Sequence, residues 1–189
     1  MCGRIEVISG CMFSGKTTEL LRRIRRYMLA NKKCILVKHT MDDRYSSTSV
    51  VSHDERRMKA IVCSDLSSLN ETFSNAQIVA IDEGQFYTNL FEVCRELANK
   101  GKVVIVAALD ATYLRTPFEN VSKLCADAES ITKLFAVCQC EKDGKTCGCD
   151  ASFTWRTASR EKPIEYVGGS EMYIPVCRNC YNNLNLHLK

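Results

Sequence analysis

The chain has 189 residues, of which 46% are hydrophobic and 25% are charged, and its formal net charge is +4. This balance is that of an ordinary globular protein, and the length predicts one domain, or one domain with a small appendage. The longest apolar run, residues 103–109, is too short to span a bilayer; Arg4 and Glu6 interrupt any signal-peptide core; and the charge is too small to argue by itself for a nucleic-acid partner. We therefore expect a cytoplasmic protein that binds neither membranes nor nucleic acid.

The first predicted strand, residues 5–8, leads into a glycine-rich loop. Residues 10–17 read Gly-Cys-Met-Phe-Ser-Gly-Lys-Thr, which matches the phosphate-binding pattern G-x4-G-K-[ST]. In such a loop the backbone N–H groups and the following helix N-terminus bind phosphate, the lysine contacts the β and γ phosphates, and the threonine hydroxyl binds Mg²⁺. A chance match in a glycine turn is the alternative, but strand, loop and helix follow in the order that a real site requires. The residues assigned here to ATP are Gly10, Met12, Phe13, Ser14, Gly15, Lys16, Thr17 and Thr18.

A helix is predicted from about Thr17, because apolar side chains recur at helical spacing. They are Leu20, Leu21, Ile24, Tyr27 and Met28. The arginines at positions 22, 23, 25 and 26 fill the opposite face, so we interpret them as a solvated surface; a nucleic-acid patch is the alternative.

Acidic side chains follow the next predicted strands, residues 34–37, 78–81 and 103–109. Ligands of an open parallel sheet bind at the carboxyl ends of its strands. Asp82 is therefore placed to hold Mg²⁺, and Glu83 to act as a general base, unless both merely cap the loop into the next helix. Asp42, Arg44 and Asp110 also follow strands; they suit metal binding and phosphate clamping, but taken alone they are ordinary polar loop residues.

Short apolar strands alternate with helices along most of the chain. A helix is predicted over residues 90–98, ending at Gly101, and a fifth strand over residues 134–137. Strands that are apolar on both faces and separated by helices predict an α/β fold, with a parallel sheet flanked by helices.

The composition of the sequence changes after residue 137, because six of the twelve cysteines fall between positions 138 and 180. Cys177 and Cys180 form a C-x2-C knuckle, and a second pair must come from Cys138, Cys140, Cys147 and Cys149. Four thiolates would make a closed, structural zinc site; free thiols and an iron–sulfur cluster are the alternatives. We therefore predict a nucleotide-binding domain over residues 1–137 and a small zinc-ribbon-like module over residues 138–189, with most other cysteines serving as core hydrophobes.

Longer stretches of the chain resemble the type II thymidine kinases, the small cytosolic, bacterial and poxviral family. The matching stretches are residues 10–20, 42–47, 52–54, 81–86, 104–110, 117–118, 133–138, 167–169 and 173–181. The most specific are Asp-Glu-Gly-Gln-Phe at 82–86 and the ending Val-Gly-Gly, Tyr and C-x2-C. The resemblance implies that ATP phosphorylates the 5′-hydroxyl of thymidine, or of deoxyuridine, to give the monophosphate in nucleotide salvage.

The same resemblance implies roles for individual residues. Glu83 is the general base, with Arg44 and Lys16 also catalytic. Asp42, Arg44, Asp82 and Gln85 belong to the phosphate and metal set. The residues around thymine and its sugar are Met12, Phe86, Tyr113, Phe118, Thr154, Val167, Gly168 and Tyr173. Residues 154–173 are the flexible lasso that covers the nucleoside and is anchored on zinc. The family is typically a homotetramer that thymidine triphosphate inhibits.

The chain departs from the family pattern at several positions. Cys11 stands where proline is usual, a change expected to loosen the loop, and Tyr113 stands where phenylalanine is common. The first zinc knuckle is expanded by a hairpin with an Asp-Gly turn at 143–144. Because Cys138 follows Leu-Phe-Ala-Val and Cys147 keeps the spacing to Ala-Ser-Phe-Thr, the predicted zinc ligands are Cys138, Cys147, Cys177 and Cys180, with Cys140 as the rival.

Two functions of other classes fit part of the sequence. A P-loop ATPase switch or motor with a zinc-ribbon partner module would share the same motifs, with Glu83 polarising water, but 189 residues leave little room for a second motor domain. A nucleic-acid-binding zinc ribbon rests on weak charge alone. Because the chain ends nine residues after Cys180, we expect no regulatory tail.

Overall fold

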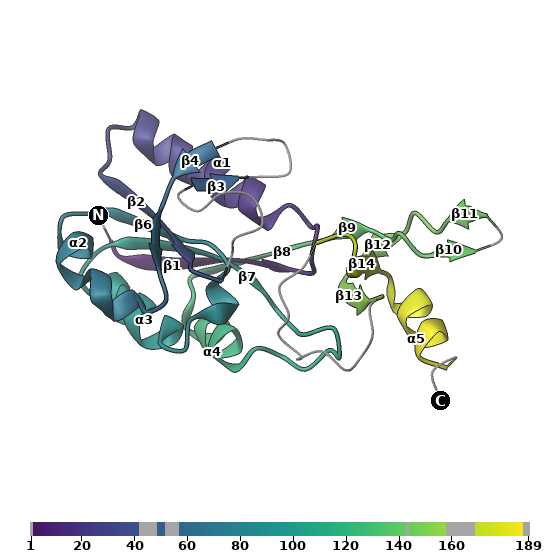
Figure 1. The fold of residues 1–189 in the computed structure, drawn as a ribbon. Coiled ribbons are helices and arrows are strands. Elements are labelled where there is room, and N and C mark those ends of the chain that lie inside the picture. The colour runs from purple at the N-terminus through teal and green to yellow at the C-terminus, as the bar shows by residue number, and fades with distance from the viewer. Residues whose placement is uncertain (1, 42–48, 52–56, 143, 158–168, 187–189) are drawn as a thin grey trace.

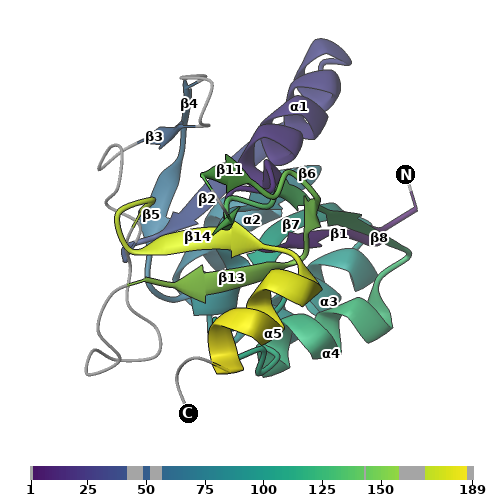
Figure 2. The same cartoon turned by 90° about the vertical axis from the view of Figure 1, so that its right-hand side faces the viewer.

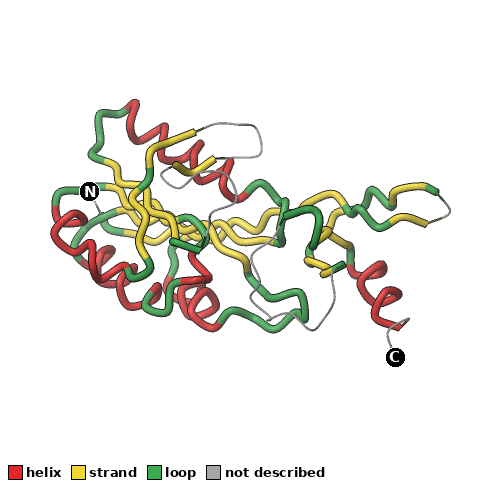
Figure 3. The backbone as a smooth tube through the Cα atoms, in the orientation of Figure 1, coloured by secondary structure: helices red, strands yellow, loops and turns green. Residues whose placement is uncertain are grey.

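The protein is described by a computed structural model, which covers residues 2–41, 49–51, 57–142, 144–157 and 169–186. Figure 1 shows a central sheet with helices on both sides and a smaller module beyond one end of it, and Figure 3 shows the same division by secondary structure. Among the described residues, no helix is long and apolar enough to cross a membrane.

The central sheet is parallel throughout, in the order β5-β2-β6-β7-β1-β8. Its strands are β1 (Arg4–Gly10), β2 (Cys34–His39), β5 (Ile61–Cys63), β6 (Ile78–Ile81), β7 (Val103–Leu109) and β8 (Ser130–Leu134). Every residue of β6 is buried, as is β7 up to its last residue, because helices cover both faces. The predicted α/β fold is confirmed.

Two separate cores lie on the two faces of the sheet. Helix α1 (Lys16–Leu29) packs Leu20, Leu21 and Ile24 against one face. The other face is covered by α3 (Leu90–Asn99) and α4 (Glu119–Asp127), together with the short α2 (Asn70–Ser74) and the 3-10 turn η1 (Leu66–Leu69). A small antiparallel hairpin, β3 (Ser49–Val51) with β4 (Arg57–Lys59), precedes β5.

Helix α1 differs from its prediction in two side chains. Met28 is 49% exposed, so the buried stripe ends before it. Arg23 is not simply solvated: its guanidinium donates to Glu6 on β1, to Glu19 and to Thr132 on β8. The arginine face of the helix is thus partly used to hold α1 to the edge of the sheet.

The strand predicted over residues 134–137 is divided in two. Residues Ser130–Leu134 form β8, the edge strand of the sheet, whereas Ala136–Val137 form β9, which pairs with β12 (Asp150–Ala151). The chain therefore leaves the sheet at Phe135.

The remaining elements build the smaller module, seen end-on in Figure 2. Strands β13 (Phe153–Arg156) and β14 (Tyr173–Val176) pair antiparallel, and α5 (Arg178–Leu186) follows. Strands β10 (Glu141–Lys142) and β11 (Lys145–Thr146) pair antiparallel, as expected for strands on either side of an Asp-Gly pair.

Candidate active site

The loop between β1 and α1 has the backbone that its glycines predict. Gly10 has φ +151°, and a Cβ there would lie 2.4 Å from the carbonyl oxygen of Leu134, so a side chain has no room. Gly15, just before α1, has φ +82°, a left-handed conformation that costs glycine little. Phe13 adopts a positive φ of 65° as well, so the loop folds back on itself in front of the helix N-terminus.

Lys16 is buried at the base of this loop. Its ammonium donates to the carbonyl oxygen of Cys11 at 2.7 Å, and the Ser14 hydroxyl donates to the same oxygen at 2.8 Å. Burial lowers the pKa of Lys16, although the negative charges of Glu83 and Asp82 act to raise it. A cation held among carboxylates at a helix N-terminus is suited to bind the terminal phosphates of a nucleotide.

Thr17 and Asp82 meet beside this lysine. The Thr17 hydroxyl lies 3.2 Å from both carboxylate oxygens of Asp82, which is 3% exposed at the end of β6. A hydroxyl and a carboxylate side by side next to a phosphate-binding loop are the oxygen ligands that Mg²⁺ takes in such sites. The two groups that the sequence assigns to magnesium thus come from separate segments of the chain to one point.

Glu83 follows Asp82 in a left-handed conformation, with φ 52° and ψ 44°. Such a conformation costs of order 1–3 kcal/mol for a residue other than glycine, so the surrounding contacts must hold it. Gln85 is one of them: its Nε2 donates to Glu83 Oε2 at 2.5 Å, and its Oε1 accepts from the Leu109 N–H at 3.0 Å. Glu83 and Gln85 are therefore fixed relative to the ends of β6 and β7.

The smaller module contacts the phosphate-binding loop directly. The Met12 N–H donates to Thr154 Oγ1 at 3.0 Å, and the Cys11 thiol donates to the carbonyl oxygen of Ala151 at 3.3 Å. Cys11 is buried in the same apolar cluster as Trp155 and Val176, so the expected loosening of the loop at Cys11 is countered by packing.

A second contact ties the module to the loop after β7. The Tyr181 hydroxyl of α5 donates to the carbonyl oxygen of Tyr113 at 2.8 Å. The buried guanidinium of Arg156 lies 5.3 Å from the Tyr113 ring and 6.0 Å from the Tyr173 ring. Two of the residues predicted around the nucleoside, Tyr113 and Tyr173, are thus brought together around one arginine.

The other predicted residues fall into two groups. Phe86 ends the 3-10 turn η2 (Gly84–Phe86) after Glu83, and Phe118 precedes α4, where its N–H donates to the carbonyl oxygen of Asp110. Asp110 pairs with Lys133 at 2.7 Å, which is the ordinary structural use of a strand-end acid. Predicted residues that lie outside the described part of the chain are Asp42, Arg44, Val167 and Gly168, together with the middle of the predicted lasso.

Sequence reasoning missed several residues around this site, among them Arg156 and Tyr181. Both make contacts with Tyr113, more than 40 residues earlier in the chain. Arg156 stands in no motif, and Tyr181 is only the last residue of the matching stretch 173–181, with no role assigned to it. Only the pairing of β13 with β14 and the docking of α5 bring them to the loop after β7. No local pattern in the sequence could have found them.

Four cysteines of the module converge. The sulfur atoms of Cys138, Cys147, Cys177 and Cys180 all lie within 4.8 Å of one another, and those of Cys147 and Cys177 are 4.0 Å apart. Hydrogen bonds from Cys149 lower the pKa of the Cys147 thiol to about 7, which favours the thiolate that metals bind. These are the four cysteines that the sequence predicts; among the described residues, Cys140 is not part of the cluster.

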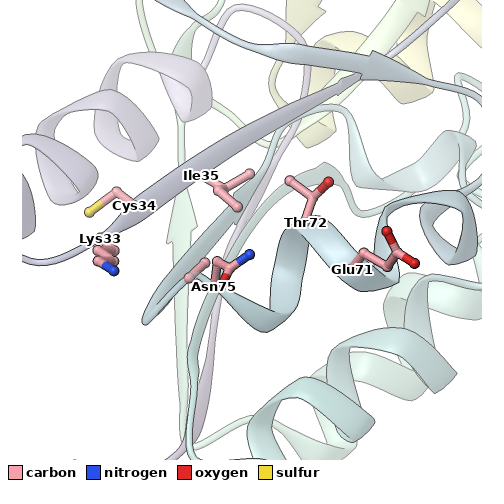
Figure 4. Close-up of a pocket in the computed structure, with 7 residues that line it drawn as sticks. Lys33, Cys34, Ile35, Glu71, Thr72 and Asn75 are labelled. Carbon is pink, nitrogen blue, oxygen red and sulfur yellow. The ribbon is translucent and has the colours of Figure 1, made fainter.

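One hollow of about 570 Å³ lies far from these groups, at the start of β2 beside α2 (Figure 4). Its lining includes Lys33, Cys34, Glu71 and Asn75. Because every strand of the sheet runs parallel, the start of β2 is at the opposite edge from the loop after β1. The phosphate-binding loop, the paired acids and the docked module therefore locate the candidate site at the other edge.

Comparison with known proteins gives a consistent result. Residues 3–181 match the family described as thymidine kinase. Thymidine kinase 1 of Dictyostelium discoideum is 46% identical over 187 residues, covering 97% of this chain and 79% of the relative. The thymidine kinase of Vaccinia virus (strain Ankara) is 44% identical over 179 residues, covering 95% of this chain and 97% of the relative. Among solved structures, the Legionella pneumophila ATPase DotB is 13% identical with a TM-score of 0.46, over 72% of this chain and 42% of that one, which is too low to carry an argument.

Proposed function

This chain belongs to the thymidine kinase family, and from that premise we propose that it transfers the γ-phosphoryl group of ATP to the 5′-hydroxyl of thymidine. The observation that best supports this reaction is the meeting of three groups at one sheet edge. Lys16 with its loop, the Thr17–Asp82 pair and Glu83 all lie at the carboxyl ends of β1 and β6. A phosphate site, a magnesium site and a base are the parts that phosphoryl transfer requires.

Each group has a definite part in the proposed reaction. Lys16 and the loop N–H groups bind the β and γ phosphates, and Thr17 with Asp82 would hold Mg²⁺, which supplies charge neutralisation on the phosphates. Glu83 accepts the proton of the 5′-hydroxyl as that oxygen attacks phosphorus, while ADP departs. Gln85 keeps the Glu83 carboxylate in place, and Asp42 and Arg44 complete the phosphate and metal set.

We propose that the cysteine cluster holds one structural zinc ion. Zn–S bonds of about 2.3 Å in a tetrahedron place the sulfur atoms about 3.8 Å apart. The 4.0 Å between the sulfur atoms of Cys147 and Cys177 fits this geometry. Four thiolates leave no open position for a substrate, so the ion would hold β9, β12, β14 and α5 together rather than take part in chemistry. This supports a division into a catalytic part, residues 1–137, and a zinc-anchored substrate lid, residues 138–189.

In this proposal, the lid segment 154–173 recognises the thymine ring of the substrate. Its backbone N–H and C=O groups pair with the carbonyl oxygens and ring N–H of thymine, while Met12, Phe86, Tyr113, Phe118 and Tyr173 surround base and sugar. Cytosine reverses donor and acceptor at two of these positions, which leaves buried groups unpaired at about 1–3 kcal/mol each. Deoxyuridine differs from thymidine by one methyl group and remains a substrate.

Several further properties follow from membership of the family. We propose a cytoplasmic homotetramer that thymidine triphosphate inhibits by feedback. These properties rest on the 44–46% identity to named thymidine kinases over nearly the whole chain.

A competition assay tests the proposed substrate. Thymidine and deoxycytidine are supplied together with Mg-ATP, and kcat/KM is compared for each, with deoxyuridine as the matched pyrimidine that keeps the thymine edge. We expect thymidine and deoxyuridine to be phosphorylated and deoxycytidine to be poorer by at least about a hundredfold. Equal efficiencies would show a broad deoxynucleoside kinase, in which side chains rather than the lid backbone read the base.

A further inference from the structure

His39 is a buried histidine at the edge of the candidate site with no role in the reaction described above. It ends β2 and is 5% exposed. Its Nδ1 accepts a hydrogen bond from the Met41 N–H at 3.1 Å. Burial lowers the pKa of His39, against a hydrogen bond to the backbone of Ser64, so at neutral pH the ring is in the neutral form that can accept this bond.

The His39 ring also packs against the end of the turn that carries Glu83 and Phe86. Its centroid lies 5.6 Å from that of Phe86, at a tilted angle of 41°, and 4.7 Å from that of Tyr87, edge to face at 77°. These are the spacings at which aromatic rings attract one another. Tyr87 is fully buried, so its contact with the imidazole holds the His39 ring in place.

The turn η2 is fixed at three points, of which His39 provides the last. At its start, a Cβ on Gly84 would lie 2.7 Å from Val106 Cγ1, so the backbone lies directly on β7. In its middle, Gln85 Oε1 accepts from the Leu109 N–H. At its end, the Phe86 side chain packs against the His39 ring, which reaches it from β2.

We propose that His39 is a positioning residue of the nucleoside site, which sets the orientation of the Phe86 ring by packing against it. This inference rests on the proposed function, in which Phe86 contacts the nucleoside. His39 itself touches neither substrate nor reacting atoms. Removing its ring would let Phe86 turn away from the nucleoside while leaving Lys16, Thr17 and Asp82, which bind ATP, unaffected.

Two substitutions separate the ring of His39 from its hydrogen bond with Met41. His39→Asn keeps a short acceptor for the Met41 N–H but has no ring; it should raise the KM for thymidine about tenfold and leave the KM for ATP within about twofold. His39→Phe keeps the ring without the acceptor, and should restore the KM for thymidine to within about threefold of the wild-type value. If His39→Asn does not fold, His39→Leu, which fills the space without a ring, should show the same split.

Phe73→Leu is the matched control, because Phe73 is also buried but belongs to α2, which lies beside the start of β2, whereas His39 ends that strand. It should lower Tm without changing either KM. An unchanged KM for thymidine in folded His39→Asn or His39→Leu, or no rescue by folded His39→Phe, would overturn the inference about His39. A wild-type protein that fails to phosphorylate thymidine would instead overturn the proposed function, and the role of His39 with it.

Discussion

Replacing Glu83 with glutamine should greatly slow phosphoryl transfer and leave the fold and nucleoside binding intact. Gln85 Nε2 donates to Glu83 Oε2 at 2.5 Å, and the amide oxygen introduced by Glu83→Gln can accept the same N–H, so the new side chain stays in place. The substitution also keeps a side chain of the same size at a backbone position with φ 52°, so strain does not change. What is lost is the basic oxygen that takes the proton of the 5′-hydroxyl.

The expected loss can be stated as a barrier. A positioned general base contributes about 10²–10⁴ in rate, which corresponds to about 3–5 kcal/mol. The assay is kcat at saturating Mg-ATP and thymidine, together with calorimetric binding of thymidine, which should stay within about twofold of wild type. Glu141→Gln, an exposed glutamate in the β10–β11 hairpin, is the control and should leave both unchanged. Turnover of Glu83→Gln within tenfold of wild type would refute Glu83 as the base.

Three further predictions concern the module and the stability of the chain. Cys147→Ser should lose zinc, measured by atomic absorption, and lose activity, whereas Cys140→Ser should keep both; the reverse pattern would assign the site to Cys140. Thr154→Val should leave the Met12 N–H without its acceptor and destabilise the protein by about 1–3 kcal/mol, seen as a lower Tm, while Thr154→Ser should be near wild type; equal Tm values would show that this bond does not stabilise the docked module. Arg22 and Arg23 lower the pKa of Glu19 to about 2, so Glu19 stabilises the fold above its ordinary pKa of 4.5 and loses that effect as the pH falls toward 2. Glu19→Gln should therefore lower stability at pH 7 by about 1 kcal/mol or less, with the difference from wild type shrinking toward zero as the pH falls to about 2; a difference that persists undiminished there would contradict this origin.

The parts of the fold that the sequence predicts are those in which local pattern and tertiary environment agree. The loop at residues 10–17 needs glycine, lysine and threonine at fixed positions. Their spacing in the sequence therefore shows where the strand ends, where the loop lies and where the helix begins. Strands β6 and β7 are apolar along their length because both of their faces are buried. The cysteine cluster was predictable because the C-x2-C knuckle at 177–180 needs a second pair of cysteines, and the family spacing before Cys138 and after Cys147 selects that pair.

The parts that escaped prediction depend on position in the whole fold. Strand β8 lies at the edge of the sheet, where Ile131 is 52% exposed. Its sequence is therefore less apolar than residues 134–137, and for this reason the strand was predicted at 134–137 instead. Met28 follows the helical spacing but lies beyond the part of α1 that is buried. His39 and Arg156 act through contacts with residues more than 40 positions away, which exist only once β2 lies beside β6 and the module docks on the loop after β7.

The central claim is that this protein moves a phosphoryl group from ATP to a nucleoside hydroxyl rather than to water. Phosphorus-31 NMR of the reaction with Mg-ATP, with and without thymidine, tests it most directly. The account predicts ADP and thymidine 5′-monophosphate in equal amounts, and almost no ADP when thymidine is left out. Formation of ADP and inorganic phosphate at the same rate with and without thymidine would contradict it, and would identify the chain as an ATPase in which Glu83 polarises water.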